Sequence, residues 1–196
     1  ILEKRNGRYD LWLYLSESIM HYTSEYDSPL GKILLACDDV GLTGVWFEGQ
    51  KYFAFNLDKE HQPQDNQIFT TTKKWLDSYF SGQEPDFLPP LHLVGTKFRT
   101  EVWKILLRIP YGQTMTYGQI AKLMATKHGL KTMSAQAVGG AVGHNDISII
   151  IPCHRVVGTN SSLTGYAGGI DRKVKLFQLE HMDLNKFIVP TKGTAI

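Results

Sequence analysis

Cys153 is the side chain with the clearest capacity for chemistry, and it lies in the run Ile-Pro-Cys-His-Arg at residues 151–155. A cysteine is largely un-ionised at neutral pH, so a nucleophilic cysteine needs a base or a positive charge beside it. His154 can supply the base, and Glu180 can orient its imidazole as in a catalytic triad. An isolated Cys-His pair is more often structural than catalytic, so the surroundings of the pair decide its meaning.

The charge of the chain is divided unevenly between its halves. Residues 1–90 hold 8 Lys and Arg against 14 Asp and Glu, whereas residues 91–196 hold 13 against 5. A basic half indicates contact with a polyanion such as nucleic acid, although charge also scatters unevenly without function. At 196 residues and 42% hydrophobic composition, the chain is long and apolar enough for one or two folded domains.

The two cysteines argue against a disulfide framework and against a cysteine-based zinc site. Cys37 follows an apolar segment and fits a structural role. We therefore expect no metal, no cofactor and a reducing, cytoplasmic setting. The sequence also lacks an apolar run of about 18–20 residues, so no membrane contact is expected. Residues 1–19, which precede Met20, are expected to be a non-native or disordered leader.

The first half predicts a small sheet with a helix. Residues 32–37 and 42–47 are β-prone, and Asp-Asp-Val-Gly between them predicts a turn, so the two segments form a hairpin. Residues 70–80 carry apolar side chains at helical spacing. Three prolines between residues 85 and 90 place a domain boundary near residue 90.

The second half predicts a helix-turn-helix. An apolar face runs from Phe98 to Leu106, and Thr116 with Gln119 fits a capping box at the start of a further helix. A short helix follows over residues 134–142, and its Ala and Gly side chains are too small to read base edges. Close approach of its backbone to DNA explains the small residues, and so does tight packing of this helix on its neighbour.

The residues around Cys153 make the resemblance specific. Ala-Val-Gly-Gly-Ala begins at Ala137, and it is followed by Asn145, Ile-Pro-Cys-His-Arg-Val-Val, Gly-Tyr-Ala-Gly-Gly from Gly165, and Glu180. This order resembles the active-site signature of the O6-alkylguanine-DNA alkyltransferases, also called methylated-DNA–protein-cysteine methyltransferases, and of their single-protein bacterial-type members. The match covers residues 20–185 approximately and includes Ser-Pro-Leu-Gly at residues 28–31.

The resemblance implies a role for each matched residue. Cys153 would accept the alkyl group irreversibly, with His154 acting through a water and held by Glu180. Asn145 would bond the backbone on both sides of its turn, and Tyr117 would help guanine leave. The implied pocket for the base consists of Val142, Val156, Tyr166, Ala167 and Gly168.

The resemblance also implies that duplex DNA containing O6-alkylguanine binds through its minor groove to a monomer, which flips the damaged base out. The implied DNA-binding residues are Thr116, Tyr117, Ser134, Ala135, Gln136, Ala137, Gly139, Gly140 and Arg155. Arg155 can instead pair with a carboxylate. Gln136 stands where the family has an arginine, and weaker DNA affinity or slower flipping is expected. Asp146, where relatives often have proline, would place a negative charge near the DNA or cap a helix.

The predicted fold is α/β (α+β). Residues 20–90 would form a ribonuclease-H-like sheet-and-helix domain, and residues 91–185 a helical winged-helix domain that carries the active site. Residues 186–196 would form a flexible tail. The expected function is single-turnover DNA repair by transfer of an alkyl group from O6-alkylguanine, and from O4-alkylthymine. The alternatives are a cysteine hydrolase using Cys153, His154 and Glu180, and a non-catalytic regulator that binds damaged DNA.

Overall fold

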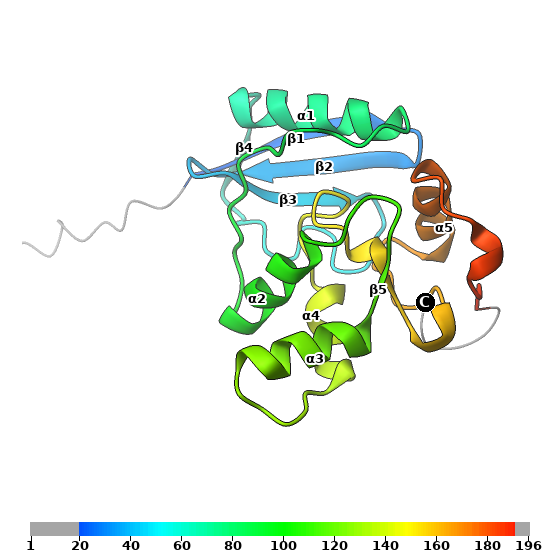
Figure 1. Ribbon diagram of the computed structural model, residues 1–196. Coiled ribbons are helices and arrows are strands. Elements are labelled where there is room, and N and C mark those ends of the chain that lie inside the picture. Colours follow the sequence, from blue (N-terminus) through cyan, green and yellow to red (C-terminus); the bar gives the residue numbers. More distant parts are fainter. Residues whose placement is uncertain (1–19, 191–196) are drawn as a thin grey trace, which may run out of the picture.

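The computed structural model describes residues 20–190 (Figure 1). The prediction for residues 1–19 lies outside this range. The first part is a sheet of four strands in the order β3-β2-β1-β4, with β1 parallel to β4 and the other pairs antiparallel. The strands are β1 (His21–Ser28), β2 (Gly31–Cys37), β3 (Leu42–Phe47) and β4 (His61–Pro63). Helix α1 (Gln67–Phe80) runs along one side of the sheet, and the helices of the second part lie on the other side.

The predicted hairpin is confirmed as β2 and β3, and its turn is held by Asp38. The Asp38 carboxylate accepts hydrogen bonds from the amides of Val40 (2.9 Å) and Gly41 (3.0 Å), which is the ordinary way an aspartate stabilises a tight turn. Every residue of β3 is buried. The second part of the molecule packs against this strand, because Val45 exchanges backbone hydrogen bonds with Asp146 and Ser148.

Helix α1 extends three residues further toward the N-terminus than the sequence predicts. Asn66 caps it by accepting a hydrogen bond from the amide of Phe69 (3.0 Å), so the helix begins at Gln67. Its buried face includes Trp75, Leu76 and Tyr79, spaced so that all point toward the sheet and the second part.

The second part contains the predicted helix-turn-helix. Its first three α-helices are α2 (Lys97–Leu106), α3 (Tyr117–Lys127) and α4 (Ala135–Gly143). The predicted capping box is present: the Gln119 amide donates to Thr116 (3.1 Å), and the Gln119 side chain accepts from the Thr116 amide (2.7 Å). Ser134 caps α4 by accepting from Ala137. No helix in residues 20–190 is long and apolar enough to cross a membrane.

The segment that carries the cysteine forms a turn. Ile149 takes a left-handed conformation (φ 70°), and Cys153–Arg155 form a single 3-10 turn, η2. The short strand β6 (Val156–Val157) follows and pairs in parallel with β5 (Met115–Thr116). Helix α5 (Ile170–Leu179) then ends at Glu180, its C-terminal capping residue. A turn lets the consecutive side chains of Cys153 and His154 point in different directions.

The two parts share one hydrophobic core. Residues of β2, β3 and α1 pack in the same cluster as residues of α2, α3 and α4. Backbone hydrogen bonds also join the parts, because the Val45 amide donates to Asp146 (2.8 Å) and the Ser148 amide donates back to Val45 (3.0 Å). The segment before Cys153 is therefore attached directly to strand β3.

The predicted flexible tail from residue 186 is wrong at its start. The Phe187 ring packs edge-on against Phe177 with centroids 5.0 Å apart. The Ile188 amide donates to Ser161 (3.1 Å), and the Ile188 carbonyl accepts from Leu163 (2.9 Å). These contacts hold residues 187 and 188 against the second part of the molecule. Residues 191–196 lie outside the described residues.

Candidate active site and DNA-facing cavity

Glu180 organises a buried cluster of polar side chains from both parts of the molecule. Its Oε1 accepts from His154 Nε2 at 2.6 Å and from the Tyr79 hydroxyl at 2.8 Å. Its Oε2 accepts from the Gly112 amide at 3.0 Å. Arg155 donates to both carboxylate oxygens, from Nε at 2.9 Å and from the second terminal nitrogen at 3.1 Å. The carboxylate is thus saturated with donors, and its orientation is fixed.

The charges in this cluster set the form of each group. The positive Arg155 and the bonded His154 help lower the pKa of Glu180 to about 2 although burial opposes this, so the carboxylate is ionised. Burial lowers the pKa of the His154 imidazole, although Glu180 acts in the opposite direction. Because Nε2 donates to Glu180, the neutral ring presents Nδ1 as an acceptor, and this buried atom has no protein partner. His154 is therefore a base with one free nitrogen.

Cys153 is buried, with 4% of its surface exposed, and its thiol does not bond His154 directly. Burial raises the pKa of the Cys153 thiol. Two neighbours oppose that shift: the Asn145 amide donates to the sulfur at 3.1 Å, and the positive charge of Lys173 favours the thiolate. The thiol of Cys153 is therefore mostly protonated in the folded protein, and Asn145 and Lys173 stabilise the thiolate when it forms.

Asn145 binds the backbone on both sides of its turn, as the sequence predicts. Its side-chain oxygen accepts from the Ile147 amide (3.1 Å), and its amide group donates to the Ile151 carbonyl (2.8 Å) as well as to Cys153. One amide therefore fixes both the path of the chain after α4 and the position of the sulfur.

Arg155 is not on the DNA-facing surface, and the prediction that it binds DNA is wrong. Only 9% of it is exposed, and its guanidinium is held by Glu180 and by the Ile109 carbonyl (2.6 Å). Pairing with a carboxylate was the alternative for this residue. The physical reason is that Glu180 would be a buried, uncompensated charge without a fixed cation beside it.

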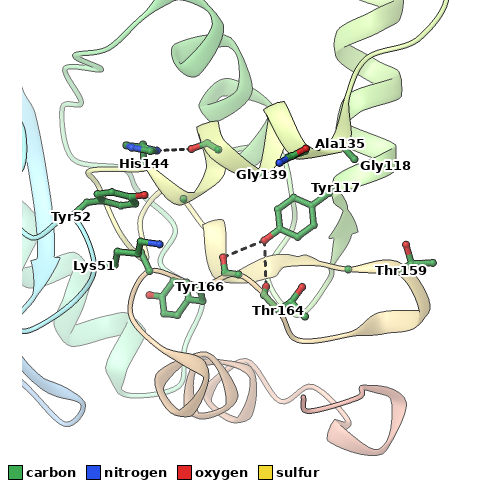
Figure 2. A pocket seen from close by; sticks show the side chains of 16 residues that line it. Lys51, Tyr52, Tyr117, Gly118, Ala135, Gly139, His144, Thr159, Thr164 and Tyr166 are labelled. Carbon is green, nitrogen blue, oxygen red and sulfur yellow. Dashed lines mark hydrogen bonds between the residues drawn. The ribbon is translucent and has the colours of Figure 1, made fainter. Parts of the chain in front are cut away.

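A cavity of about 820 Å³ opens beside the helix-turn-helix (Figure 2). Tyr117 lies on one side of it, Tyr166 on another, and Lys51 and Tyr52 from the first part face Tyr117 across it. The cavity is lined by Lys51, Tyr52, Tyr117, Gly118, Ala135, Gln136, Gly139, Gly140, Gly143, His144, Gly158, Thr159, Thr164, Gly165, Tyr166 and Ala167.

Seven of the residues predicted for the pocket or for DNA line this cavity: Tyr117, Ala135, Gln136, Gly139, Gly140, Tyr166 and Ala167. Five predicted residues do not line the cavity: Thr116, Ser134, Ala137, Val156 and Gly168. Four of them are next in sequence to a lining residue, and Val156 directly follows the turn that contains Cys153. The prediction that Val142 belongs to the pocket for the base is wrong. Its side chain is buried in the hydrophobic core, and Gly139 and Gly143 of the same helix line the cavity instead.

The loop at residues 164–168 is fitted closely to two tyrosines. The Tyr117 hydroxyl donates to the carbonyls of Thr164 (3.3 Å) and Gly165 (3.2 Å). Gly165 has φ +72°, and a Cβ there would lie 2.6 Å from that hydroxyl. A Cβ at Gly168 would lie 2.5 Å from the Tyr166 ring. Glycine is therefore required at both positions for the loop to fold around the cavity.

Sequence reasoning missed Lys173 and Tyr79. Lys173 is fully buried and donates to the carbonyls of Val156 (2.6 Å) and Thr164 (3.0 Å), and burial lowers its pKa to about 7. Its signal was present, because it lies on the same face of α5 as the buried Leu176 and Phe177. Tyr79 gave no signal, since a tyrosine on the apolar face of a helix is ordinary core.

Asp146 also lies elsewhere than predicted. It neither faces the DNA side nor caps a helix: it is buried and accepts hydrogen bonds from the Trp46 indole (3.2 Å) and from the Asn56 side chain. Burial raises the pKa of the Asp146 carboxyl to about 6. This residue therefore links the end of α4 to the first part of the molecule.

A thiol supported by a histidine–carboxylate pair, beside a cavity lined by a helix-turn-helix, suits transfer of a group from DNA to a cysteine. The similarity of this chain to known proteins agrees with that chemistry. The family model for the 6-O-methylguanine DNA methyltransferase ribonuclease-like domain matches residues 20–93, and that for the DNA binding domain of the same proteins matches residues 97–182. The chain therefore belongs to the 6-O-methylguanine DNA methyltransferase family, as its sequence predicts.

Relatives in two domains of life match most of the chain. A methylated-DNA–protein-cysteine methyltransferase of Mycobacterium bovis is 42% identical over 83% of this chain and 93% of its own length. One from Methanosarcina acetivorans is 41% identical over 81% of this chain and 97% of its own. The crystal structure of Mycobacterium tuberculosis OGT in complex with DNA superposes with a TM-score of 0.69 at 39% identity, covering 86% of this chain and 95% of that one. The mixed α/β fold with an N-terminal ribonuclease-like part is thereby confirmed.

Proposed function

We propose that this protein repairs duplex DNA by transferring the alkyl group of O6-alkylguanine, and of O4-alkylthymine, to Cys153 in a single irreversible turnover. The observation that carries the proposal is the thiol itself, with an amide, a cation and a histidine–carboxylate pair arranged around it. Cys153 does not line the cavity, but it is near enough to the lining Tyr117 and Tyr166 for its charge to add to burial in raising the pKa of both. The family assignment supports this activity over cysteine hydrolysis. Binding as a monomer through the minor groove belongs to the same proposal.

The transfer balances without any co-reactant. The Cys153 sulfur forms a bond to the alkyl carbon as the bond from that carbon to O6 breaks, in one in-line displacement. The electron pair of the broken bond stays on the guanine, which takes up a proton and becomes the normal base. The thiol supplies the proton, and the thioether that remains has no leaving group, so the protein is consumed.

The proton leaves the thiol toward His154. Nδ1 of the imidazole is the buried acceptor that lacks a protein partner, and a water between it and the sulfur would complete the path. Glu180 holds the imidazole through Nε2 and stabilises its positive form. Tyr79 and Arg155 act through Glu180, since both donate to its carboxylate. They are positioning residues in this proposal.

The base reaches the cavity after it leaves the helical stack. The small residues of α4 that line the cavity, Ala135, Gly139 and Gly140, let the DNA backbone approach closely. Gln136 lies among them and fills the space left by the base without adding charge. Tyr166 forms a wall against which the flipped base stacks, the Ala167 amide approaches O6, and the Val156 carbonyl accepts from the guanine amino group.

Tyr117 connects the DNA surface to the chemistry. In the free protein its hydroxyl is held by the Thr164 and Gly165 carbonyls, at the edge of the cavity. We place it near N3 of the bound guanine, where its O–H donates a hydrogen bond that stabilises the negative charge developing on the leaving base, while the proton that the base takes up comes from the thiol. Burial raises the pKa of Tyr117 well above its usual value, so it is a donor at neutral pH.

Intact mass spectrometry tests the proposal after incubation with duplex DNA that contains O6-methylguanine. We expect the protein to gain the mass of one CH2, stoichiometrically and permanently, and the Cys153→Ala variant to gain nothing. Tight binding of the damaged duplex without any mass change would support the non-catalytic regulator. Neither binding nor mass change would contradict the proposal and leave hydrolysis to be tested.

A further inference from the structure

The cavity has a third wall that comes from the first part of the molecule. Lys51 and Tyr52 follow strand β3 and face Tyr117 across the cavity (Figure 2). None of the predicted site residues lies in this segment. The wall lies 83 residues or more before the α4 residues of the cavity in sequence, so motif reasoning over the second half could not find it.

Three contacts hold this segment against the site. The Lys51 amide donates to the Ala167 carbonyl at 3.0 Å, which ties it to the loop that would enclose the base. The Tyr52 ring stacks on His144, at the C-terminal end of α4, with centroids 4.1 Å apart and planes at 23°. Asn56 donates to Asp146, two residues beyond His144.

The backbone of the segment takes an uncommon conformation at two positions. Tyr52 has φ 59° and Ala54 has φ 51°, in the left-handed region that side chains with a Cβ seldom adopt. Such a conformation persists where surrounding contacts fix it, and it is found preferentially at functional sites. Here it turns the Tyr52 ring onto His144 and directs Lys51 to the cavity.

Lys51 carries the only permanent charge among the sixteen residues that line this cavity, all of which belong to the described part of the chain. Its ammonium is exposed and lies 5.3 Å from the centroid of the Tyr52 ring, within the range of a cation–π interaction. The opposite wall on α4 is uncharged, because Ala135, Gln136, Gly139, Gly140 and Gly143 form it. A DNA strand at this cavity would therefore meet its cation on the first part of the molecule.

We infer that Lys51 is a DNA-binding residue of this protein, pairing with a phosphate beside the flipped nucleotide, and that Tyr52 positions it through its stack on His144. The inference rests on the proposed function. A lysine that neutralises one phosphate releases about one counterion, so it contributes to affinity and to the salt dependence of binding but not to base specificity.

The test compares Lys51→Gln, Lys51→Arg and Lys59→Gln with the wild type. Lys59 is an exposed lysine of the same region that does not line the cavity, which makes it the matched control. Affinity for a duplex containing O6-methylguanine is measured between about 50 and 200 mM salt, with Cys153→Ala as the background so that binding is not followed by reaction. Methyl transfer to each protein with Cys153 intact is measured in parallel.

We expect K51Q to lose about five- to tenfold in affinity at low salt and to reduce the slope of log K against log salt by about 0.9. K51R should keep the wild-type affinity and salt slope, because the positive charge is retained. K59Q should change neither the affinity nor the slope. Tyr52→Ala should reproduce the K51Q loss while Tyr52→Phe does not, and combining K51Q with Y52A should add little, because both changes remove one interaction.

Wild-type affinity and slope in K51Q, in a protein that is methylated normally, would overturn the inference and leave the proposed function standing. A wild type that neither binds the duplex nor takes up a methyl group would overturn both. If Y52A loses affinity for the duplex while K51Q does not, Tyr52 stabilises the fold and does not position a DNA contact.

Discussion

Cys37 and Cys153 sit in regions that share much of their chemistry. Each thiol is buried and accepts a hydrogen bond from an asparagine amide at 3.1 Å, Asn66 for Cys37 and Asn145 for Cys153. Each region also holds a carboxylate–imidazole pair: Asp38 lies 2.5 Å from His92, and Glu180 lies 2.6 Å from His154. A list of residue types would not tell the two sites apart.

The charges and the nearby cavity separate the two regions. Burial raises the pKa of Cys37, and the charges of Asp38 and Asp39 raise it further. Near Cys153 the nearby charge is Lys173, which favours the thiolate, and the Glu180 carboxylate is neutralised by Arg155. Both cysteines belong to the same hydrophobic core, but Cys153 lies close enough to the cavity-lining Tyr117 and Tyr166 for its charge to add to burial in raising the pKa of both hydroxyls. We therefore expect the reactivity of Cys153 to follow from these surroundings and not from the thiol, its amide partner or the histidine pair.

The largest expected effect comes from removing each sulfur in turn. Cys153→Ala should abolish methyl uptake, whereas Cys37→Ala should be methylated at the wild-type rate and should lose only about 1 kcal/mol in the free energy of unfolding. Uptake followed by mass spectrometry and a urea melt measures both. Equal loss of uptake in the two variants would contradict the distinction between the regions.

The next effect concerns the two carboxylates. Glu180→Gln should slow methyl transfer by roughly 100-fold, because the base loses the partner that orients and charges it. The variant should also lose about 3–5 kcal/mol of stability, since Arg155 is left buried without its counter-ion. Asp38→Asn is the matched control and should leave the single-turnover rate unchanged while destabilising the hairpin turn. Comparable rates for E180Q and the wild type would exclude the relay.

The same carboxylate gives a prediction for stability in acid. The folded protein lowers the pKa of Glu180 from an ordinary 4.5 to about 2, so the unfolded chain binds more protons between these values. The stabilisation is complete above about pH 4.5 and is lost as the pH falls toward 2. Denaturant melts should show this acid loss in the wild type and a smaller one in E180Q. Equal losses would mean that the pair does not stabilise the fold.

Lys173 should have a smaller effect on rate. Lys173→Met removes the cation near Cys153, and a rise of about one unit in the thiol pKa would slow transfer about tenfold at neutral pH. Because the Lys173 pKa is lowered from 10.5 to about 7, the wild type should gain stability as the pH rises through this range, and K173M should lack that gain. Single-turnover rates and melts against pH measure the two effects. An unchanged rate in K173M would show that the lysine serves only the loop carbonyls.

Gln136→Arg should have the smallest effect, and it tests whether position 136 contacts the DNA. An added arginine should raise duplex affinity several-fold and steepen the salt slope by about 0.9. Gln178→Arg, on an exposed position of α5 away from the cavity, is the control for net charge. Identical affinities for the two variants would indicate that position 136 does not meet the DNA.

Local sequence patterns predicted the local structure well. The hairpin with its Asp38 turn, the capping box at Thr116 and the short helix after Ser134 all form as expected, because each depends on a few neighbouring residues. Asn145 bonds the backbone on both sides of its turn, as the family resemblance implies. The family signature supplied the identity of the cysteine site.

Contacts between distant segments could not be predicted. Tyr79 reaches Glu180 across 101 positions, and Asp146 reaches Trp46 across 100, so no spacing rule connects them. Arg155 was ambiguous because adjacency to the thiol in sequence does not fix the direction of a side chain in a turn. Lys173 shows the opposite case, where a charged residue on an apolar helix face marked a buried role that was overlooked.

Peptide mapping of the wild-type protein after reaction with an O6-methylguanine duplex tests the central claim most directly. Digestion followed by tandem mass spectrometry locates the methyl group on a single residue. We predict complete methylation of Cys153 and none of Cys37, at one methyl group per protein. Methylation shared between the two cysteines, or found on any other residue, would contradict the conclusion that the surroundings of Cys153 make it the acceptor.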